Sequence, residues 1–267
     1  MEVVHIFGYI GALLTGLVLG LLGGGGAAVS IPILVYAFGV EASVATGYSL
    51  LIVAFTALLG TVQNIRLGHV RYGALVKCGL PALVAIYVMR RFLIHSIPTV
   101  FLSAGGFTLT KNSFILFILS AFMIIVARNM IWPRQADTAV KPTPYWWILV
   151  QSIVIGLFTG LVGAGGGFLL IPLILSVEPM EFRYATATSL ALVTLNSGIG
   201  FIGDLQSHQH IDWSFLGTFA VLSVAGVLGG IAIANKVDNV KLRRIFGYTM
   251  MTIALYILIR EFAVPFR

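Results

Sequence analysis

Eight long apolar segments dominate this sequence and restrict what it can fold into. They cover residues 5–38, 44–63, 72–89, 112–132, 145–177, 184–203, 213–235 and 245–259. Continuous runs of this kind are typical of α-helices that cross a bilayer, which need about 20 apolar residues each, and they lack the alternation of membrane β-strands. Only 9% of the residues are charged, whereas a soluble protein carries about 25%. The sequence therefore predicts an all-α polytopic membrane protein whose surface contacts the lipid bilayer.

A polar segment divides the chain into two halves. Residues 133–144, with the sequence PRQADTAVKPTP, contain three prolines and no apolar period. Proline-rich polar stretches mark connections between structured segments. We therefore expect one membrane domain made of a first transmembrane repeat (1–132), a linker (133–144) and a second transmembrane repeat (145–267).

The two halves are copies of one another. When the chain is shifted by 140 residues, residues 16–60 match residues 156–200 at 16 of 45 positions without a gap. With one further residue inserted, His69 aligns with His210. An internal repeat of this extent is typical of transporters and channels.

The basic residues distinguish two orientations of these repeats. If the first long segment of each half crosses the membrane once, the repeats are parallel and the 16 Lys and Arg residues divide equally between the two sides. If each segment turns back at its glycines, the second repeat is inverted and eleven basic residues share one side, which the positive-inside rule makes cytoplasmic. These eleven are Arg66, Arg71, Lys77, Arg128, Arg134, Lys141, Arg183, Lys236, Lys241, Arg243 and Arg244.

That asymmetry favours inverted repeats. Each repeat is expected to contain a glycine-broken helix, re-entrant or paired, and three transmembrane helices. The expected location is the inner (plasma) membrane, with both termini outside and the central linker in the cytoplasm. The net charge of +7 then sets orientation and does not indicate binding to nucleic acid.

Glycine clusters interrupt the first segment of each half, at residues 23–26 and 163–167. Glycine costs a helix about 1 kcal/mol per residue relative to alanine, so each cluster should break its helix. The break would leave free backbone N–H groups at the start of the next helix, where the helix dipole favours an anion. The alternative is that the small residues serve only for close helix packing. The predicted substrate-binding glycines are Gly24, Gly25, Gly26, Gly165, Gly166 and Gly167.

Hydroxyl and amide side chains inside the apolar segments extend this predicted site. Thr46 and Ser49 in the first half correspond to Thr186 and Ser189 in the second, and Asn196 follows two turns later. Such groups can bind an oxyanion while keeping the site neutral, and Asn is costly in a helix that faces lipid. Their alternative role is hydrogen bonding to carbonyl groups of their own or a neighbouring helix.

Charged residues near the membrane edges are weaker candidates. Lys77 is expected to extend toward the cytoplasmic surface. Arg90 and Arg91 are expected to form either a structural anchor or an outer mouth for anions. Solvated loop positions, from which a histidine could also relay protons, are expected for His69, His208, His210, Asp204 and Asp212.

Signatures of catalysis or of a cofactor are absent from the sequence. The single cysteine, Cys78, excludes a thiolate cluster, and no pair of histidines has the spacing of a helical metal site. The Walker A, GxSxG, HExxH and GxGxxG patterns are missing. We therefore expect no metal, no cofactor and no enzymatic activity, and an intramembrane enzyme would need a base beside Cys78.

The repeated glycine motifs resemble those of a known family. GLLGGGGAAVSIP at Gly20–Pro32 and GLVGAGGGFLLIP at Gly160–Pro172 are each followed by a second motif, ATGYSL and ATATSL respectively. Together they are similar to the TauE/SafE family of sulfite and organosulfonate exporters. The resemblance implies a carrier that exports a small oxyanion by alternating access, above all sulfite or an organosulfonate, with protons as an optional partner. A carrier of thiosulfate, sulfoacetate or a carboxylate, and a non-transporting membrane scaffold, remain open.

Overall fold

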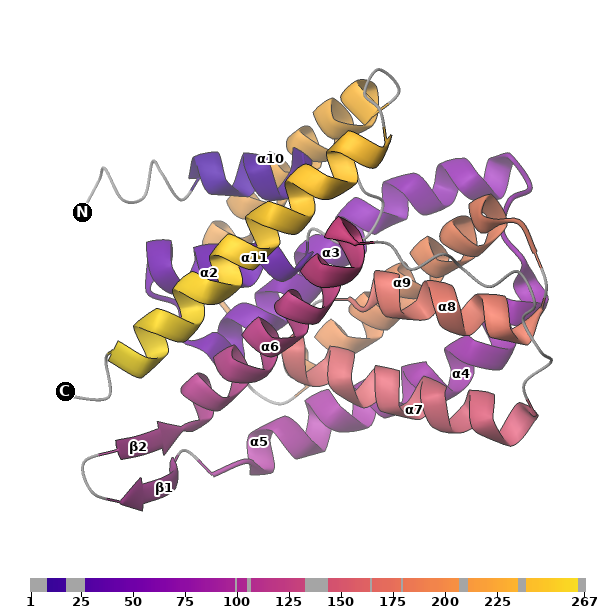
Figure 1. Ribbon diagram of the computed structural model, residues 1–267. Helices are drawn as coiled ribbons and strands as arrows, with labels where there is room; N and C mark the ends of the chain where they lie inside the picture. The colour runs from indigo at the N-terminus through magenta and orange to yellow at the C-terminus, as the bar shows by residue number, and fades with distance from the viewer. Residues whose placement is uncertain are drawn as a thin grey trace.

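Helices make up almost all of the structure (Figure 1). The computed structural model describes residues 9–17, 27–98, 100–104, 107–132, 144–163, 165–178, 180–206, 211–234 and 239–263. Residues 9–17 are helical, and the first half continues with α2 (Ala27–Phe38), α3 (Ala42–Arg66), α4 (Tyr72–Val88), a π-helical turn (Met89–Leu93), α5 (Ile94–Ser96) and α6 (Lys111–Ile131). The second half contains α7 (Tyr145–Val162), α8 (Gly167–Val177), α9 (Phe182–Leu205), α10 (Trp213–Ala234) and α11 (Asn239–Ala263).

Six helices in the described part of the chain are long and apolar enough to cross a membrane. They are α3, α4 with its π-helical turn, α6, α7, α9 and α10. Large apolar side chains lie on the outside of the bundle, for example Val84, Ile125 and Val221, which are 63%, 60% and 69% exposed. An apolar surface of this kind on several spanning helices suits hydrocarbon better than water. The prediction of an all-helical multi-pass membrane protein is confirmed.

A short β-hairpin is the one non-helical addition in the described part of the chain. It lies within residues 95–111, a stretch that has no equivalent in the second half. Strand β1 (Val100–Ala104) pairs antiparallel with β2 (Phe107–Thr110), and the hairpin projects at one end of the bundle beyond α5 (Figure 1). The side chain of Thr110 then caps α6 by accepting a hydrogen bond from the Ser113 amide at 3.2 Å. The hairpin therefore extends the structure outside its spanning helices.

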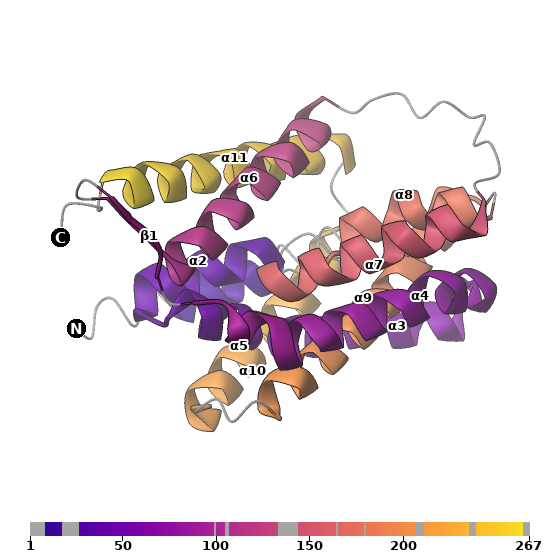
Figure 2. The same ribbon diagram turned by 90° about the horizontal axis from the view of Figure 1, so that it is seen from below.

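The equivalent helices α3 and α9 pack against each other inside the bundle, between the α6–α11 pair and α10 (Figure 2). Gly60 of α3 lies against Leu190, and the equivalent Gly200 of α9 lies against Leu50. Because the contact moves backward along α9 as it moves forward along α3, the two helices run antiparallel. An added Cβ would lie 2.6 Å from Leu190 at Gly60 and 2.9 Å from Leu50 at Gly200, so the absence of a side chain sets the closeness of both contacts.

The loops that follow these two helices also make a pair of equivalent contacts, in which the two halves are interchanged. The Arg71 amide donates a hydrogen bond to the Thr188 hydroxyl at 3.0 Å. At the equivalent positions of the other half, the Asp212 amide donates to the Tyr48 hydroxyl at 2.9 Å. Each contact is thus repeated with the two halves exchanged, as a two-fold relation between them requires.

A third pair of equivalent contacts leads to a prediction about stability. Gly156 of α7 packs against Ala82 of α4, and the equivalent Gly16 packs against Ser223 of α10. An added Cβ at Gly156 would lie 2.5 Å from the Ala82 carbonyl oxygen, so we expect Gly156→Ala to lower the free energy of unfolding by about 1–3 kcal/mol. Gly217→Ala on α10, where nothing lies within 4 Å, is the control. Unfolding in detergent measures both, and equal stabilities would contradict a tight contact at Gly156.

The first segment of the chain turns back on itself. The ring of Tyr9 lies 5.4 Å from the ring of Phe38, and Gly11 lies against Ile33, so residues 9–17 and α2 are antiparallel. The 12 residues of α2 span about 18 Å, roughly half of a bilayer core. This geometry favours a re-entrant segment over a single crossing, and the predicted site glycines Gly24, Gly25 and Gly26 lie outside the described residues.

Candidate functional site

The second glycine cluster breaks its helix between Val162, where α7 ends, and Gly167, where α8 begins. Gly163, Gly165 and Gly166 have φ values of +71°, +66° and +69°. Residues other than glycine adopt this left-handed backbone conformation only at a cost in free energy. Gly166 is the N-cap residue of α8 and has no side chain to accept hydrogen bonds from the first turn. The break therefore presents the positive end of a short helix inside the membrane domain.

Helices α3 and α9 enclose this break from two sides. Gly163 lies against the backbone of Thr46 on α3. A Cβ added to Gly165 would lie 2.9 Å from Val53 of α3 and 3.1 Å from the Ser197 hydroxyl of α9. On α9 the Ser189 hydroxyl donates a hydrogen bond to the carbonyl oxygen of Gly167. The equivalent helices of the two halves thus meet at the glycine break.

Asn196 and Ser197 supply polar groups that the protein itself does not satisfy. Both residues are fully buried, and neither the Asn196 amide nor the Ser197 hydroxyl has a hydrogen-bond partner in the described structure. Positions 189, 193, 196 and 197 follow helical spacing, so Asn196 shares the face of α9 on which Ser189, Val193 and Ser197 meet the break. Buried polar atoms are nearly always paired in proteins, so an unpaired group marks a place for a ligand or water.

The other predicted site residues are distributed around this centre. The Thr46 hydroxyl donates to the carbonyl oxygen of Ser43 at 2.8 Å, which is the local role left open by the sequence. The Ser49 and Ser30 hydroxyls lie 2.6 Å apart and link α3 to α2. Thr186 is half-buried on α9, three residues before Ser189. The structure therefore brings Thr46, Ser189 and Asn196 to the second break, whereas Ser49 contacts α2 in the first half.

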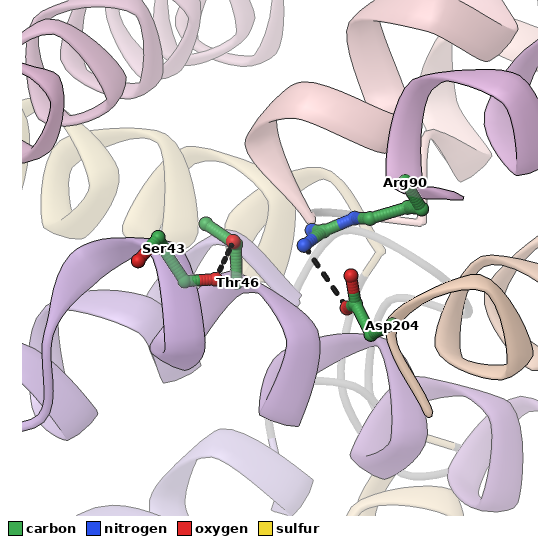
Figure 3. A network of polar contacts seen from close by, with 4 residues as sticks. All are labelled: Ser43, Thr46, Arg90 and Asp204. Carbon is green, nitrogen blue, oxygen red and sulfur yellow. Dashed lines mark hydrogen bonds and ion pairs between the residues drawn. The ribbon is translucent and has the colours of Figure 1, made fainter. Parts of the chain in front are cut away.

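A buried ion pair lies beside this site, and the sequence interpretation missed it (Figure 3). Arg90 Nη1 lies 3.1 Å from Asp204 Oδ2, with the two side chains 0% and 2% exposed. The expectation that Asp204 is a solvated loop residue is wrong, because α9 continues to Leu205 and carries the carboxylate inward. A Cβ added to Gly47 would lie 2.5 Å from the Asp204 carboxylate, so the ion pair packs directly on the turn of α3 that follows Thr46.

The remaining charged candidates lie at the periphery. Lys77 is exposed. Arg91 donates from Nη1 to the Gln206 carbonyl oxygen at the end of α9. Asp212 is exposed and accepts a hydrogen bond from the Phe215 amide at the start of α10. His69 is half-buried with its ring 5.6 Å from that of Tyr184, so it packs against α9, while His208 and His210 lie outside the described residues.

A cavity of about 440 Å³ lies where α3 meets the start of α10. Tyr48 of α3 contributes to its wall, and its hydroxyl accepts a hydrogen bond from the Asp212 amide. In the described part of the chain, no group of three or more His, Cys, Asp or Glu side chains could hold a metal. The cavity is lined by Tyr9, Phe38, Val40, Tyr48, Asp212, Ser214, Phe215 and Thr218.

Comparisons with known proteins agree with this architecture. A family model described as sulfite exporter TauE/SafE matches residues 9–257. The chain is 28% identical over 262 residues to a probable membrane transporter protein of Xylella fastidiosa strain Temecula1, covering 94% of this chain and 93% of the relative. It is also 28% identical over 218 residues to the probable membrane transporter protein YunE of Bacillus subtilis, covering 76% and 78%. No solved structure is significantly similar to the chain. Because the family model spans nearly all of the sequence, the chain belongs to the TauE/SafE family of membrane transporters.

Proposed function

We propose that the protein exports a small oxyanion, sulfite or an organosulfonate, by alternating access, and that the anion binds at the second glycine break between α3 and α9. The observation that carries this proposal is the pair of buried, unpartnered side chains, Asn196 and Ser197, beside Gly165. They adjoin the N-terminus of α8, whose backbone N–H groups and dipole favour negative charge. Amide, hydroxyl and backbone donors bind an oxyanion while remaining neutral.

The packing of the two halves supports inverted repeats. The antiparallel contact between the equivalent helices α3 and α9 is the contact expected from a two-fold axis that lies in the plane of the membrane. Inverted repeats can exchange conformations, so that a central site opens first to one side and then to the other. We assign the location to the inner membrane, with the linker in the cytoplasm and both termini outside. An inside-negative potential itself drives anions outward, so proton coupling is not required.

Transport by purified protein in liposomes tests this function. Vesicles loaded with sulfite or methanesulfonate are expected to release the anion faster when the protein is present, and an inside-negative potential should accelerate release. Thiosulfate, sulfoacetate and acetate serve as competitors to rank the substrate classes. If none of these anions moves under any imposed gradient, the exporter proposal is wrong and a membrane scaffold becomes the better interpretation.

Asn196→Leu separates binding from packing in the same assay. Leucine keeps the branched shape of asparagine and removes two buried groups that have no partner, which offsets the cost of its larger volume, so the variant is expected to remain folded and close to the wild type in stability. Sulfite release should nevertheless fall by about tenfold, the loss that follows from one or two hydrogen bonds to an anion. Ser152→Ala is the control, because that hydroxyl bonds to its own helix at Ile148. A stable Asn196→Leu protein with normal transport would remove Asn196 from the site.

A further inference from the structure

The guanidinium group of Arg90 is buried with only one of its edges in use. The residue is 0% exposed, and Nη1 donates to Asp204 at 3.1 Å. Nε and Nη2 are equally buried and have no hydrogen-bond partner in the described structure. In Figure 3 the Arg90 and Asp204 side chains point toward one another, while Ser43 and Thr46 of α3 lie across from them.

Two unpartnered nitrogens of a buried cation are unusual. Burying a charged group is tolerated when its hydrogen bonds are satisfied, and each unmet donor carries a desolvation cost. The N–H bonds of Nε and Nη2 are parallel and match two oxygens of a carboxylate, phosphate or sulfur oxyanion. This edge of Arg90 therefore has the geometry of an anion receptor. It is available to a ligand because the Asp204 carboxylate bonds to the remaining nitrogen, Nη1.

We propose that the Nε–Nη2 edge of Arg90 is a second oxyanion site, separate from the glycine break and adjacent to it. The two sites share one turn of α3, because Thr46 packs on Gly163 of the break and the next residue, Gly47, packs on the ion pair. A Cβ added to Gly47 would lie 3.8 Å from Arg90 Nη1, so the absence of a side chain at Gly47 lets the ion pair pack against α3. The inference rests on the proposed function in that both sites take the same class of substrate.

The charges around Arg90 suit a site that an anion must also leave. Asp204 neutralises the guanidinium through Nη1, and Lys111 interacts electrostatically with Arg90 and Asp204, and also with Glu41. Transport requires binding that is strong enough for entry and weak enough for release, often over neighbouring sites. A bare buried arginine would hold an anion too tightly, whereas an arginine already paired with a carboxylate binds it moderately.

Anion binding to the full-length protein in detergent tests this proposal. We expect Arg90→Gln to raise the Kd for sulfite in calorimetry by about tenfold or more, because two charge-assisted hydrogen bonds are lost. Arg91→Gln removes the same charge one residue away, where Nη1 bonds to a backbone carbonyl, and should change the Kd by less than about twofold. Equal effects of the two variants would show a general charge effect and overturn the proposal.

A double variant addresses the possibility that Arg90→Gln fails to fold. Arg90→Met with Asp204→Leu replaces the ion pair by apolar side chains of related shape, an exchange that proteins often tolerate without loss of stability. The folded double variant should bind sulfite as weakly as Arg90→Gln. Wild-type affinity in this protein would overturn the second site.

Crystals soaked in selenite separate the two sites directly, because selenium gives an anomalous signal. The wild type should show a peak within hydrogen-bond distance of Arg90 Nε and Nη2, and Arg90→Gln should lose it. A peak at the glycine break alone would overturn this inference and leave the proposed function intact. A peak at Arg90 alone would support the inference and count against the glycine break as the substrate site.

Discussion

Gly165→Ala is expected to reduce sulfite release from liposomes by at least about tenfold. Gly165 has a φ of +66°, and an added Cβ would lie 2.9 Å from Val53 and 3.1 Å from the Ser197 hydroxyl. The methyl group would thus occupy the space in front of Ser197 and Asn196, and it would strain the backbone that starts α8. The initial rate of release from vesicles of equal protein content measures the effect.

Gly68→Ala is the matched control for backbone strain. Gly68 has a φ of +70°, but nothing lies within 4 Å of an added Cβ, so this variant carries the same strain of about 1–2 kcal/mol without touching the site. We expect it to transport at nearly the wild-type rate. If both variants lose transport to the same degree, strain alone explains the loss and the glycine break has no special role in binding.

Asp204→Ala is expected to lower the free energy of unfolding by roughly 3–5 kcal/mol. The carboxylate is the counterion of Arg90, and both side chains are essentially inaccessible to solvent. Removing it leaves an uncompensated cation in an apolar surrounding, where the charge loses far more than it would in water. Chemical denaturation in detergent, monitored by tryptophan fluorescence, gives the difference.

A second substitution identifies the cause of that loss. With Arg90→Met in the background, Asp204→Ala should cost much less than it does alone, because no charge is left unpaired. A thermodynamic cycle over the two positions is expected to give a coupling energy well above the roughly 1 kcal/mol of a surface pair. Additive effects at the two positions would contradict a buried pair and point to separate packing roles.

The glycine break could be predicted from the sequence because its causes are local. Four or five small residues in an apolar run cannot hold a helix, and the left-handed glycines at 163, 165 and 166 follow from that. Asn196 stood out for a similar reason, since an amide inside an apolar helix needs a partner or a function. The repeat also indicated which segments correspond, and the antiparallel contact between α3 and α9 agrees with the arrangement that the charge count favoured.

The ion pair could not be predicted in the same way because its causes are distant in sequence. Arg90 and Asp204 are 114 positions apart, and each looks like a residue at the end of a span. Asp204 is buried because α9 continues for one turn past the apolar run. Its carboxylate then packs against Gly47, which lies on a third helix, α3. The only available signal was an arginine pair on the side that the charge rule leaves poor in basic residues.

The two halves are similar in their backbone packing, but their polar and charged side chains differ at equivalent positions. At the positions equivalent to Asn196 and Ser197 the first half has Thr56 and Ala57, and Thr56 bonds to its own helix. The residue equivalent to Arg90 is Ile231 under the offset of 141 that relates the loops. Under the proposed alternating access, exchanging the conformations of the two halves would therefore give two states of different energy, because only one half carries the Arg90 side of the ion pair. The proposal then implies that the inward and outward forms are unequally populated, despite the two-fold packing of the helices.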